Sequence, residues 1–314
     1  MDHHPPILIV GIGAMATLFA ARLSAAGVDV TMLGTWQAGL DALRKEGARL
    51  VGLDGVERAY PVHATDDPAD CRGARLALVL VKGWQTERAA SQLYTCLDEE
   101  GLALTLQNGL GNCEILVGAL DLQRVALGVT TLGATLLAHG LARLGGDGPV
   151  SIEAHPRLSP LEVILRTAGF AVNVVEDARS LVWGKLVISA AINPLTALLR
   201  VTNGELLQRP AARSLMGELA REAAAVARAL GVGLPFEGPE NAAEDVARRT
   251  SANRSSMLQD VLRGAPTEID AICGAIVRAG EAAGLPTPVN RVMWQLVKAL
   301  LDPLPAGLSP AVSK

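Results

Sequence analysis

The chain has 314 residues, of which 50% are hydrophobic and 19% charged, and its formal net charge at pH 7 is −4. This length exceeds what one hydrophobic core usually supports, so we expect two domains. The negative charge and the lack of a Lys/Arg cluster argue against nucleic acid or an anionic membrane as partner. No apolar run reaches about 18 residues and the N-terminus has no signal-peptide pattern, which predicts a cytoplasmic protein.

The four cysteines form no CxxC pair, and no histidines stand near them at the spacing of metal ligands. In a cytoplasmic chain such cysteines are reduced packing residues. We therefore expect neither disulfides nor a bound metal.

The first segment has the pattern of a dinucleotide-binding turn. Ile7–Val10 is a short buried-strand pattern, a Gly-Ile-Gly-Ala-Met-Ala turn follows, and an apolar helix then runs to about Gly27. The first glycine allows the tight turn, the second lets the backbone approach a pyrophosphate, and the helix start supplies amide donors. Such turns also form for purely steric reasons, but the flanking strand and helix favour a cofactor site. The residues predicted to form it are Gly11, Ile12, Gly13, Ala14, Met15 and Ala16.

Strand signals then alternate with helical ones to about residue 175. Strands are expected at 28–33, 76–81, 102–107, 125–130 and 170–175, a hairpin around Asp54-Gly55, and two strand-like pieces joined by the turn 145–149. The 76–81 run is continuously apolar, as a strand covered on both faces should be. The pattern predicts an α/β domain with a Rossmann-type parallel sheet.

Two polar residues directly follow strands of this predicted sheet. Lys82 comes after the 76–81 strand, and Asn108 comes after the 102–107 strand. In an open α/β sheet, ligands bind outside the carboxyl ends of the strands. Lys82 and Asn108 are therefore cofactor or substrate candidates, with ordinary loop polarity as the alternative for each.

From about Ser180 the periodicity becomes helical. Helices are expected at 211–230, 242–249, 255–262, 268–283 and 289–301. We therefore predict a Rossmann-like dinucleotide-binding domain over 1–178 and an all-helical domain over 179–314.

A lysine lies inside the apolar helical stretch 183–194. Lys185, Ser189 and Asn193 are spaced i, i+4, i+8 and so share one helix face. Pro194 has no N–H for the carbonyl of Ala190, which leaves an acceptor beside this stripe. A polar stripe through an apolar helix indicates a functional face. The alternative is that Lys185 only extends to solvent and Asn193 caps a helix end.

Two further segments carry polar groups at predicted helix starts. Residues 253–260 read Asn-Arg-Ser-Ser-Met-Leu-Gln-Asp, whose donors can hold a carboxylate, although Ser255 would also serve as a plain N-cap. Residues 267–270 read Thr-Glu-Ile-Asp, which also fits a capping box with Thr267 as cap and Asp270 reaching back. Position alone does not decide between function and capping for Glu268.

These segments, with Val-Lys-Gly-Trp-Gln-Thr at 81–86 and Gln-Asn-Gly at 107–109, resemble ketopantoate reductase (2-dehydropantoate 2-reductase) in order and over nearly the whole chain. The resemblance implies reduction of ketopantoate to pantoate by NADPH, for pantothenate biosynthesis, in a site between two domains. It implies Lys185 as catalytic acid, Glu268 as its partner, and Lys82 near the nicotinamide. The implied substrate contacts are Asn108, Lys185, Ser189, Asn193, Ser256 and Glu268.

The chemistry of ketone reduction agrees with this resemblance. Hydride delivery to a ketone carbon builds negative charge on its oxygen, and a nearby ammonium can stabilise that charge and donate the proton. Burial would lower the pKa of Lys185 and Glu268 would raise it again. We therefore expect this pair to keep a transferable proton near neutral pH.

Two positions depart from the family pattern. Where the family commonly has an arginine for the NADPH 2′-phosphate, this chain has Thr35, and where it has an asparagine one turn after the lysine, this chain has Ser189. A hydroxyl is shorter than an amide, so a reductase of a different 2-keto acid is one alternative. A non-enzymatic nucleotide-binding protein of the same fold is another, although such a protein needs no acid. A homodimer is compatible with the sequence, which does not fix the oligomeric state.

Overall fold

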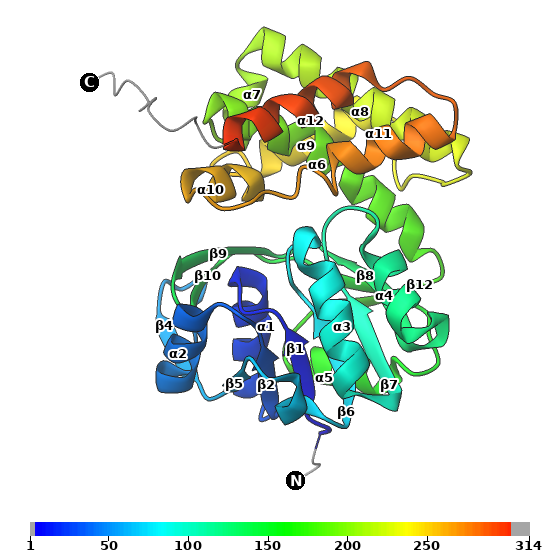
Figure 1. Cartoon of the computed structure of the whole chain (residues 1–314). Helices are drawn as coiled ribbons and strands as arrows, with labels where there is room; N and C mark the ends of the chain where they lie inside the picture. The colour runs from blue at the N-terminus through cyan, green and yellow to red at the C-terminus, as the bar shows by residue number, and fades with distance from the viewer. Residues whose placement is uncertain (1–3, 303–314) are drawn as a thin grey trace. The chain divides into compact units, whose positions relative to one another are not determined.

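The structure, a computed structural model, describes residues 4–302, and the chain divides into two compact units, Met1–Trp183 and Gly184–Lys314 (Figure 1). The long helix α6 (Ala178–Leu199) contains the division. The boundary predicted from the sequence, between 178 and 179, lies at the start of the same helix.

The N-terminal unit is built on an eight-stranded sheet with the strand order β12-β11-β8-β7-β6-β1-β2-β5. Neighbouring strands from β5 to β8 are parallel, as predicted, and so are β11 and β12, whereas β8 and β11 pair antiparallel. Its strands are β1 (Ile7–Val10), β2 (Val30–Leu33), β5 (His63–Thr65), β6 (Ala74–Val79), β7 (Leu97–Thr105), β8 (Val125–Thr130), β11 (Val150–Glu153) and β12 (Val172–Val175).

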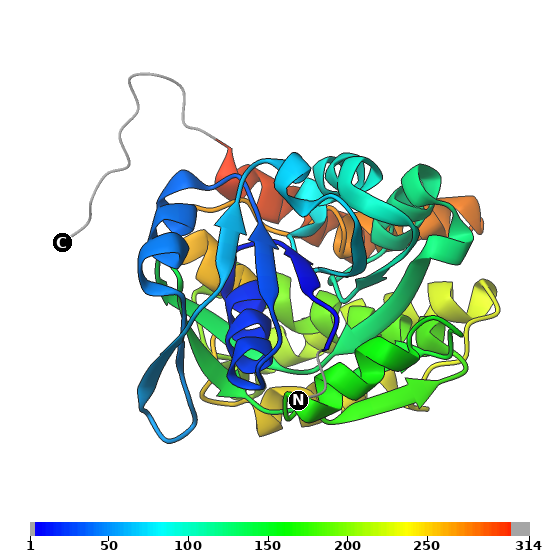
Figure 2. The same ribbon diagram turned by 90° about the horizontal axis from the view of Figure 1, so that it is seen from below.

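Helices cover both faces of this sheet, because successive residues of a buried strand point to opposite sides. Ile7 and Ile9 of β1 belong to the apolar cluster that includes α1 and α5, whereas Leu8 and Val10 belong to the cluster that includes α3 and α4. Figure 2 shows these two layers of helices on either side of the strands. The helices are α1 (Ala14–Ala25), α2 (Gln37–Glu46), α3 (Thr86–Cys96), α4 (Asn112–Leu120) and α5 (Ser159–Thr167).

A second, four-stranded sheet packs against α1 in the order β4-β3-β10-β9. Strands β3 (Ala48–Val51) and β4 (Glu57–Tyr60) form the hairpin predicted around Asp54-Gly55, and Gly55 takes the left-handed φ of +75° that the turn requires. Strands β9 (Gly133–Ala138) and β10 (Leu141–Gly146) form another hairpin, and β10 pairs with β3. Helix α1 therefore lies between two sheets, which explains why it is apolar on nearly all sides.

Short 3₁₀ helices connect parts of the N-terminal unit: η1 (Pro68–Cys71), η2 (Gly83–Gln85) and η3 (Leu122–Arg124). The four cysteines are free, and three of them are buried. Burial raises the pKa of Cys71 to about 12 and the pKa values of Cys96 and Cys113 to about 11. At neutral pH these thiols therefore stay protonated, the form in which a thiol is a poor nucleophile.

The C-terminal unit is helical, as predicted. After the part of α6 that belongs to it come α7 (Asn203–Leu207), α8 (Pro210–Ala229), α9 (Pro239–Arg249), α10 (Ser256–Leu262), α11 (Cys273–Ala282) and α12 (Pro288–Leu301). Helix α8 packs against α9, α11 and α12. Three of its alanines, Ala220, Ala223 and Ala227, are fully buried, and their small side chains permit this close approach.

One helix begins later than predicted. The helix expected from Glu268 begins at Cys273, and the residue before it, Ile272, makes no side-chain capping bond. Residues 267–269 are buried, and the backbone N–H groups of Ala271 and Ile272 both bond the carbonyl of Glu268 in a turn that precedes the helix. The hydroxyl oxygen of Thr267 has no hydrogen-bond partner among the described residues. The capping-box interpretation of this segment is therefore wrong.

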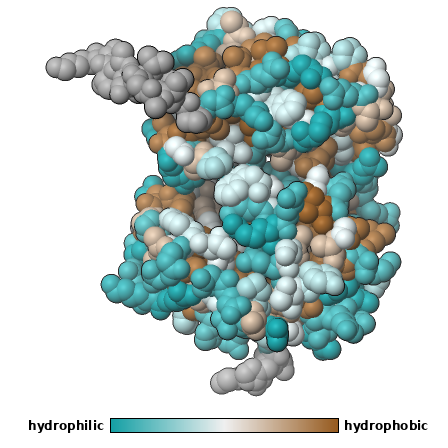
Figure 3. All heavy atoms as spheres, in the orientation of Figure 1, coloured by the Kyte–Doolittle hydropathy of each residue, from teal (hydrophilic) through white to brown (hydrophobic). Residues whose placement is uncertain are grey.

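Helix α6 is long and apolar enough to cross a membrane, but 61% of its most apolar window is buried inside the protein. This burial is typical of a core helix. The helix continues through Pro194 to Leu199, so Asn193 lies inside it and the capping interpretation of Asn193 is wrong. On the face drawn in Figure 3, hydrophilic and hydrophobic residues are intermixed over the surface of each unit.

Candidate active site

The turn after β1 has the backbone that a dinucleotide-binding turn requires. Gly11 has a φ of +132°, and a Cβ at this position would lie 3.1 Å from the backbone carbon and oxygen of Leu80. Only glycine fits there. A Cβ on Gly13, in contrast, would meet no atom within 4 Å. Packing inside the chain therefore does not require glycine at 13, whereas the close approach of a ligand to the backbone would.

Helix α1 begins at this turn with features that suit an anion. Gly13 is its N-cap residue and offers no side-chain acceptor for the first amide groups of the helix. The first turn contains only uncharged residues, so the positive end of the helix dipole is not neutralised there. Ala16 at the third glycine position is fully buried. The amides of Ala14, Met15 and Ala16 can therefore hold a pyrophosphate.

Thr35 lies just beyond the end of β2, where dinucleotide-binding proteins recognise the adenosine ribose. Its side chain is exposed. The segment Gly34-Thr35-Trp36 brings neither a carboxylate nor a cation to this place. The carboxylate that would repel a 2′-phosphate is thus absent from the segment, and so is the guanidinium that would bind one.

Lys82 and Asn108 lie in loops that follow neighbouring parallel strands, β6 and β7, and both residues are partly buried. A hydrogen-bonded network joins the two loops. The Gln107 side chain donates to the carbonyl of Val81 (3.0 Å) and to Thr86 Oγ1 (2.8 Å), while Asn112 Nδ2 donates to the carbonyl of Asn108 (2.9 Å).

Thr86 and Asn112 complete this network through a hydrogen bond between Thr86 Oγ1 and Asn112 Oδ1 (2.8 Å). Both side chains are buried. The sequence reasoning missed them because each lies at the start of a helix, where a threonine or asparagine has an ordinary local role. The network fixes the loops that carry Lys82 and Asn108.

The polar stripe predicted on α6 is present. Lys185, Ser189 and Asn193 are each partly buried on a helix whose other faces are apolar, with Leu186 and Val187 at most 2% exposed. Lys185 does not extend freely into water. The face is therefore polar and largely shielded from solvent.

Glu268 lies close to Lys185 in the same unit and is only 5% exposed. Burial lowers the pKa of Lys185 from its ordinary 10.5 to about 8, and the Glu268 carboxylate opposes this shift. These are the two opposing effects expected from the sequence. At neutral pH Lys185 therefore still carries a proton, but holds it less tightly than an exposed lysine does.

Ser255 is the N-cap of α10, where its hydroxyl accepts a hydrogen bond from the backbone N–H of Leu258 (3.0 Å). The plain capping interpretation is thus correct for Ser255. Its hydroxyl also lies 2.7 Å from Thr196 Oγ1, which donates to the carbonyl of Asn193 (2.9 Å). This contact ties the start of α10, where Ser256 is the first helical residue, to the turn of α6 that carries Asn193.

The predicted residues thus form two sets, one in each unit. The N-terminal set, at the carboxyl ends of parallel strands, comprises Gly11, Ile12, Gly13, Ala14, Met15, Ala16, Thr35, Lys82 and Asn108. The C-terminal set comprises Lys185, Ser189, Asn193, Ser256 and Glu268. Among the described residues no cluster of three His, Cys, Asp or Glu side chains could hold a metal ion.

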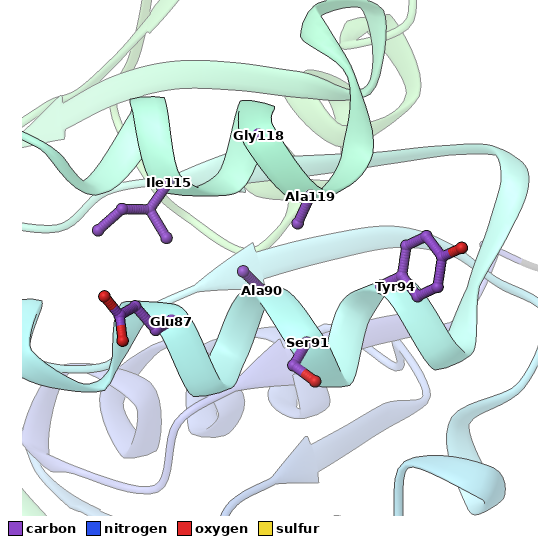
Figure 4. A pocket seen from close by; sticks show the side chains of 7 residues that line it. All are labelled: Glu87, Ala90, Ser91, Tyr94, Ile115, Gly118 and Ala119. Atoms are coloured by element: carbon purple, nitrogen blue, oxygen red, sulfur yellow. The ribbon is translucent and has the colours of Figure 1, made fainter.

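A shallow hollow of about 480 Å³ lies elsewhere in the N-terminal unit, between α3 and α4 (Figure 4). Its lining residues are Glu87, Ala90, Ser91, Tyr94, Ile115, Gly118 and Ala119. None of them belongs to either set, so this hollow is not the candidate active site.

Comparison with known proteins gives matches over most of the chain. Residues 7–157 match the family described as ketopantoate reductase PanE/ApbA, and residues 177–301 match its C-terminal family. The chain is 37% identical over 300 residues to a 2-dehydropantoate 2-reductase of Archaeoglobus fulgidus, covering 94% of this chain and 97% of the relative. It is 30% identical to the 2-dehydropantoate 2-reductase of Vibrio cholerae, covering 94% and 97%.

Solved structures of similar fold cover the same extent. A PanE/ApbA family ketopantoate reductase from Ralstonia eutropha JMP134 superposes with a TM-score of 0.88 at 32% identity, covering 94% of this chain and 98% of that one. A D-mandelate dehydrogenase solved with NADH and anilino(oxo)acetate has a TM-score of 0.87 at 23% identity, with the same coverage. The second likeness shows the shared fold alone.

Proposed function

The chain belongs to the ketopantoate reductase family, and from this premise we propose that it reduces 2-dehydropantoate to pantoate with NADPH, using Lys185 as the general acid. The observation that carries the proposal is the ammonium of Lys185, which is shielded by burial and lies beside Glu268. Pantoate formation is a step of pantothenate biosynthesis, and we expect it to take place in the cytoplasm.

The dinucleotide would bind along the carboxyl ends of the strands in the N-terminal unit. The amides at the start of α1 would hold the pyrophosphate, and Thr35 would lie at the 2′-phosphate. Lys82 would lie near the nicotinamide and Asn108 near both cofactor and substrate. When bound, the nicotinamide supplies the hydride.

The side chains of the C-terminal unit supply charge and orientation. Lys185 would stabilise the developing negative charge on the ketone oxygen and donate its proton there. With its pKa at about 8, Lys185 is charged at neutral pH, yet it releases its proton more readily than an ordinary lysine. Glu268 would keep Lys185 protonated and hold it in place. Ser189, Asn193 and Ser256 would contact the polar groups of the substrate.

A second candidate function is reduction of a different 2-keto acid, and Ser189 is the observation that favours it. Its hydroxyl lies one turn from Lys185, where the family pattern has a longer amide. A substrate with another arrangement of polar groups would then fit better. A purely nucleotide-binding role is disfavoured, because the burial of a charged lysine costs stability and a protein that only binds has no use for an acid.

A substrate panel tests these alternatives directly. Purified protein is mixed with ketopantoate and other 2-keto acids, each with NADPH and with NADH, and the loss of reduced cofactor is followed by absorbance. Turnover highest with ketopantoate supports the proposal, and turnover highest with another 2-keto acid supports the second candidate. Binding of dinucleotide without turnover of any acid would leave only the binding role. Light scattering of the same sample tests the homodimer.

A further inference from the structure

An indole side chain stands at the adenosine end of the cofactor site. Trp36 follows Thr35 at the carboxyl end of β2 and is the N-cap residue of α2. Its side chain is large and apolar, yet it is 40% exposed. Because the ribose and adenine of a dinucleotide lie beyond this strand end in Rossmann-type domains, the position of Trp36 is that of a nucleoside-binding residue.

The indole is held in a fixed orientation by two contacts. A Cβ on Gly39, in the first turn of α2, would lie 2.6 Å from Cε3 of Trp36, so the ring packs directly on the glycine backbone. The ring of His139, from the β9–β10 turn, meets the indole edge-on, with centroids 4.6 Å apart at an interplanar angle of 89°. A ring fixed in this way loses little conformational entropy when a ligand stacks on it.

Trp36 also adjoins the glycine turn. A Cβ on Gly39 would lie 3.2 Å from Cδ1 of Ile12, and a Cβ on Gly34 would lie within 3 Å of the Ile12 side chain. Ile12, the two glycines and the indole are therefore packed against one another, which connects the pyrophosphate turn to the segment beyond the end of β2.

We propose that the adenine ring of the cofactor stacks on the indole ring of Trp36. The inference rests on the proposed dinucleotide function and adds a residue to its binding site. At this strand end Gly34 and Thr35 carry no charged side chain that could bind the adenosine. The group that this segment offers for binding is therefore the aromatic face of Trp36. Stacking on an adenine does not depend on the 2′-phosphate. Trp36 therefore contributes equally to the binding of NADPH and NADH.

Isothermal titration calorimetry on the full chain tests this inference with three ligands: NADPH, NADH and reduced nicotinamide mononucleotide, which has no adenosine. In Trp36→Ala, the Kd values for NADPH and NADH should rise by the same factor, roughly 5- to 150-fold, as expected for the loss of one stacked base. The Kd for the mononucleotide should not change. Trp36→Phe, which keeps an aromatic face, should retain most of the affinity.

Tyr94→Ala is the matched control, because Tyr94 is an exposed aromatic residue (72%) of the same unit that lies on α3 and outside the candidate site. It should change none of the three Kd values. Unchanged dinucleotide affinity in Trp36→Ala would overturn the inference, and so would an equal loss for the mononucleotide or a loss in Trp36→Phe as large as in Trp36→Ala. A wild-type chain that binds both dinucleotides but reduces no keto acid would overturn the proposed function alone.

Discussion

Replacing Lys185 by Met should make the protein more stable at neutral pH while removing the proposed proton donor. The substitution keeps most of the apolar stem and deletes the ammonium. Because burial outweighs the attraction of Glu268 and lowers the pKa of Lys185 from 10.5 to about 8, the charged side chain destabilises the folded state at pH 7. We expect a gain of roughly 1–3 kcal/mol in the free energy of unfolding, somewhat less than the full pKa shift would give because Lys185 as a whole is only partly buried.

The sign of this effect depends on pH. Below about pH 8, Lys185 is charged in both the folded and the unfolded chain, and the full burial cost is present. Between pH 8 and the unfolded value of 10.5, folded Lys185 loses its proton first and the cost disappears. The advantage of Lys185→Met should therefore be largest at pH 7 and small near pH 10.5. Urea unfolding at several pH values measures it.

The same variant should lose activity in the chemical step. Loss of a general acid typically slows a reaction by roughly 10²–10⁴-fold, so kcat should fall in that range while the Kd for NADPH changes little. Lys298→Met, which removes an exposed lysine paired with Asp270, is the control and should keep normal kcat. Near-normal turnover in a folded Lys185→Met protein, or a loss of stability at pH 7, would refute this reasoning.

Further variants separate the roles of neighbouring groups. In the wild type, kcat/KM for reduction should fall above about pH 8 as Lys185 loses its proton, and Glu268→Gln should move this fall to lower pH because the carboxylate raises the pKa of Lys185. Asp270→Asn should leave the pH–rate profile unchanged and lower only the stability, since Asp270 accepts a hydrogen bond from Trp294 Nε1 (2.7 Å). If Asp270→Asn instead lost activity while Glu268→Gln behaved like the wild type, the functional and structural roles of these two carboxylates would be reversed. Thr35→Arg should lower the Kd for NADPH but not for NADH, because the guanidinium would make charge-assisted hydrogen bonds to the 2′-phosphate. A wild-type protein that already strongly prefers NADH would contradict this description of the cofactor site.

The parallel sheet and its glycine turn could be predicted from the sequence because their signals are local. A strand buried on both faces is a short continuous apolar run, as at Ile7–Val10, and the turn that follows it has a steric requirement only glycine meets, as Gly11 shows at a φ of +132°. The spacing that places Lys185 and Asn193 on one face of α6 is equally local.

The features that sequence reasoning missed depend on non-local contacts. The hairpin of β3 and β4 was predicted from its local turn, but the four-stranded sheet also pairs β3 with β10, and these two strands lie far apart in the chain. The segment at Glu268 has the composition of a helix start, but burial of Thr267 and Glu268 outweighed capping and placed the start at Cys273. Thr196 was missed because its partner, Ser255, lies 59 residues later.

The energetic cost of Lys185 distinguishes a reductase from a protein that only binds dinucleotides. The glycine turn serves both kinds of protein equally, since each must hold a pyrophosphate. The charge of the partly buried Lys185 costs roughly 1–3 kcal/mol, which is a large fraction of the 5–15 kcal/mol by which domains are typically stable. Methionine or leucine at 185 would avoid this cost without affecting the glycine turn, which lies in the other unit. The cost is accounted for if Lys185 delivers a proton to a bound keto acid, and dinucleotide binding alone gives no reason for it.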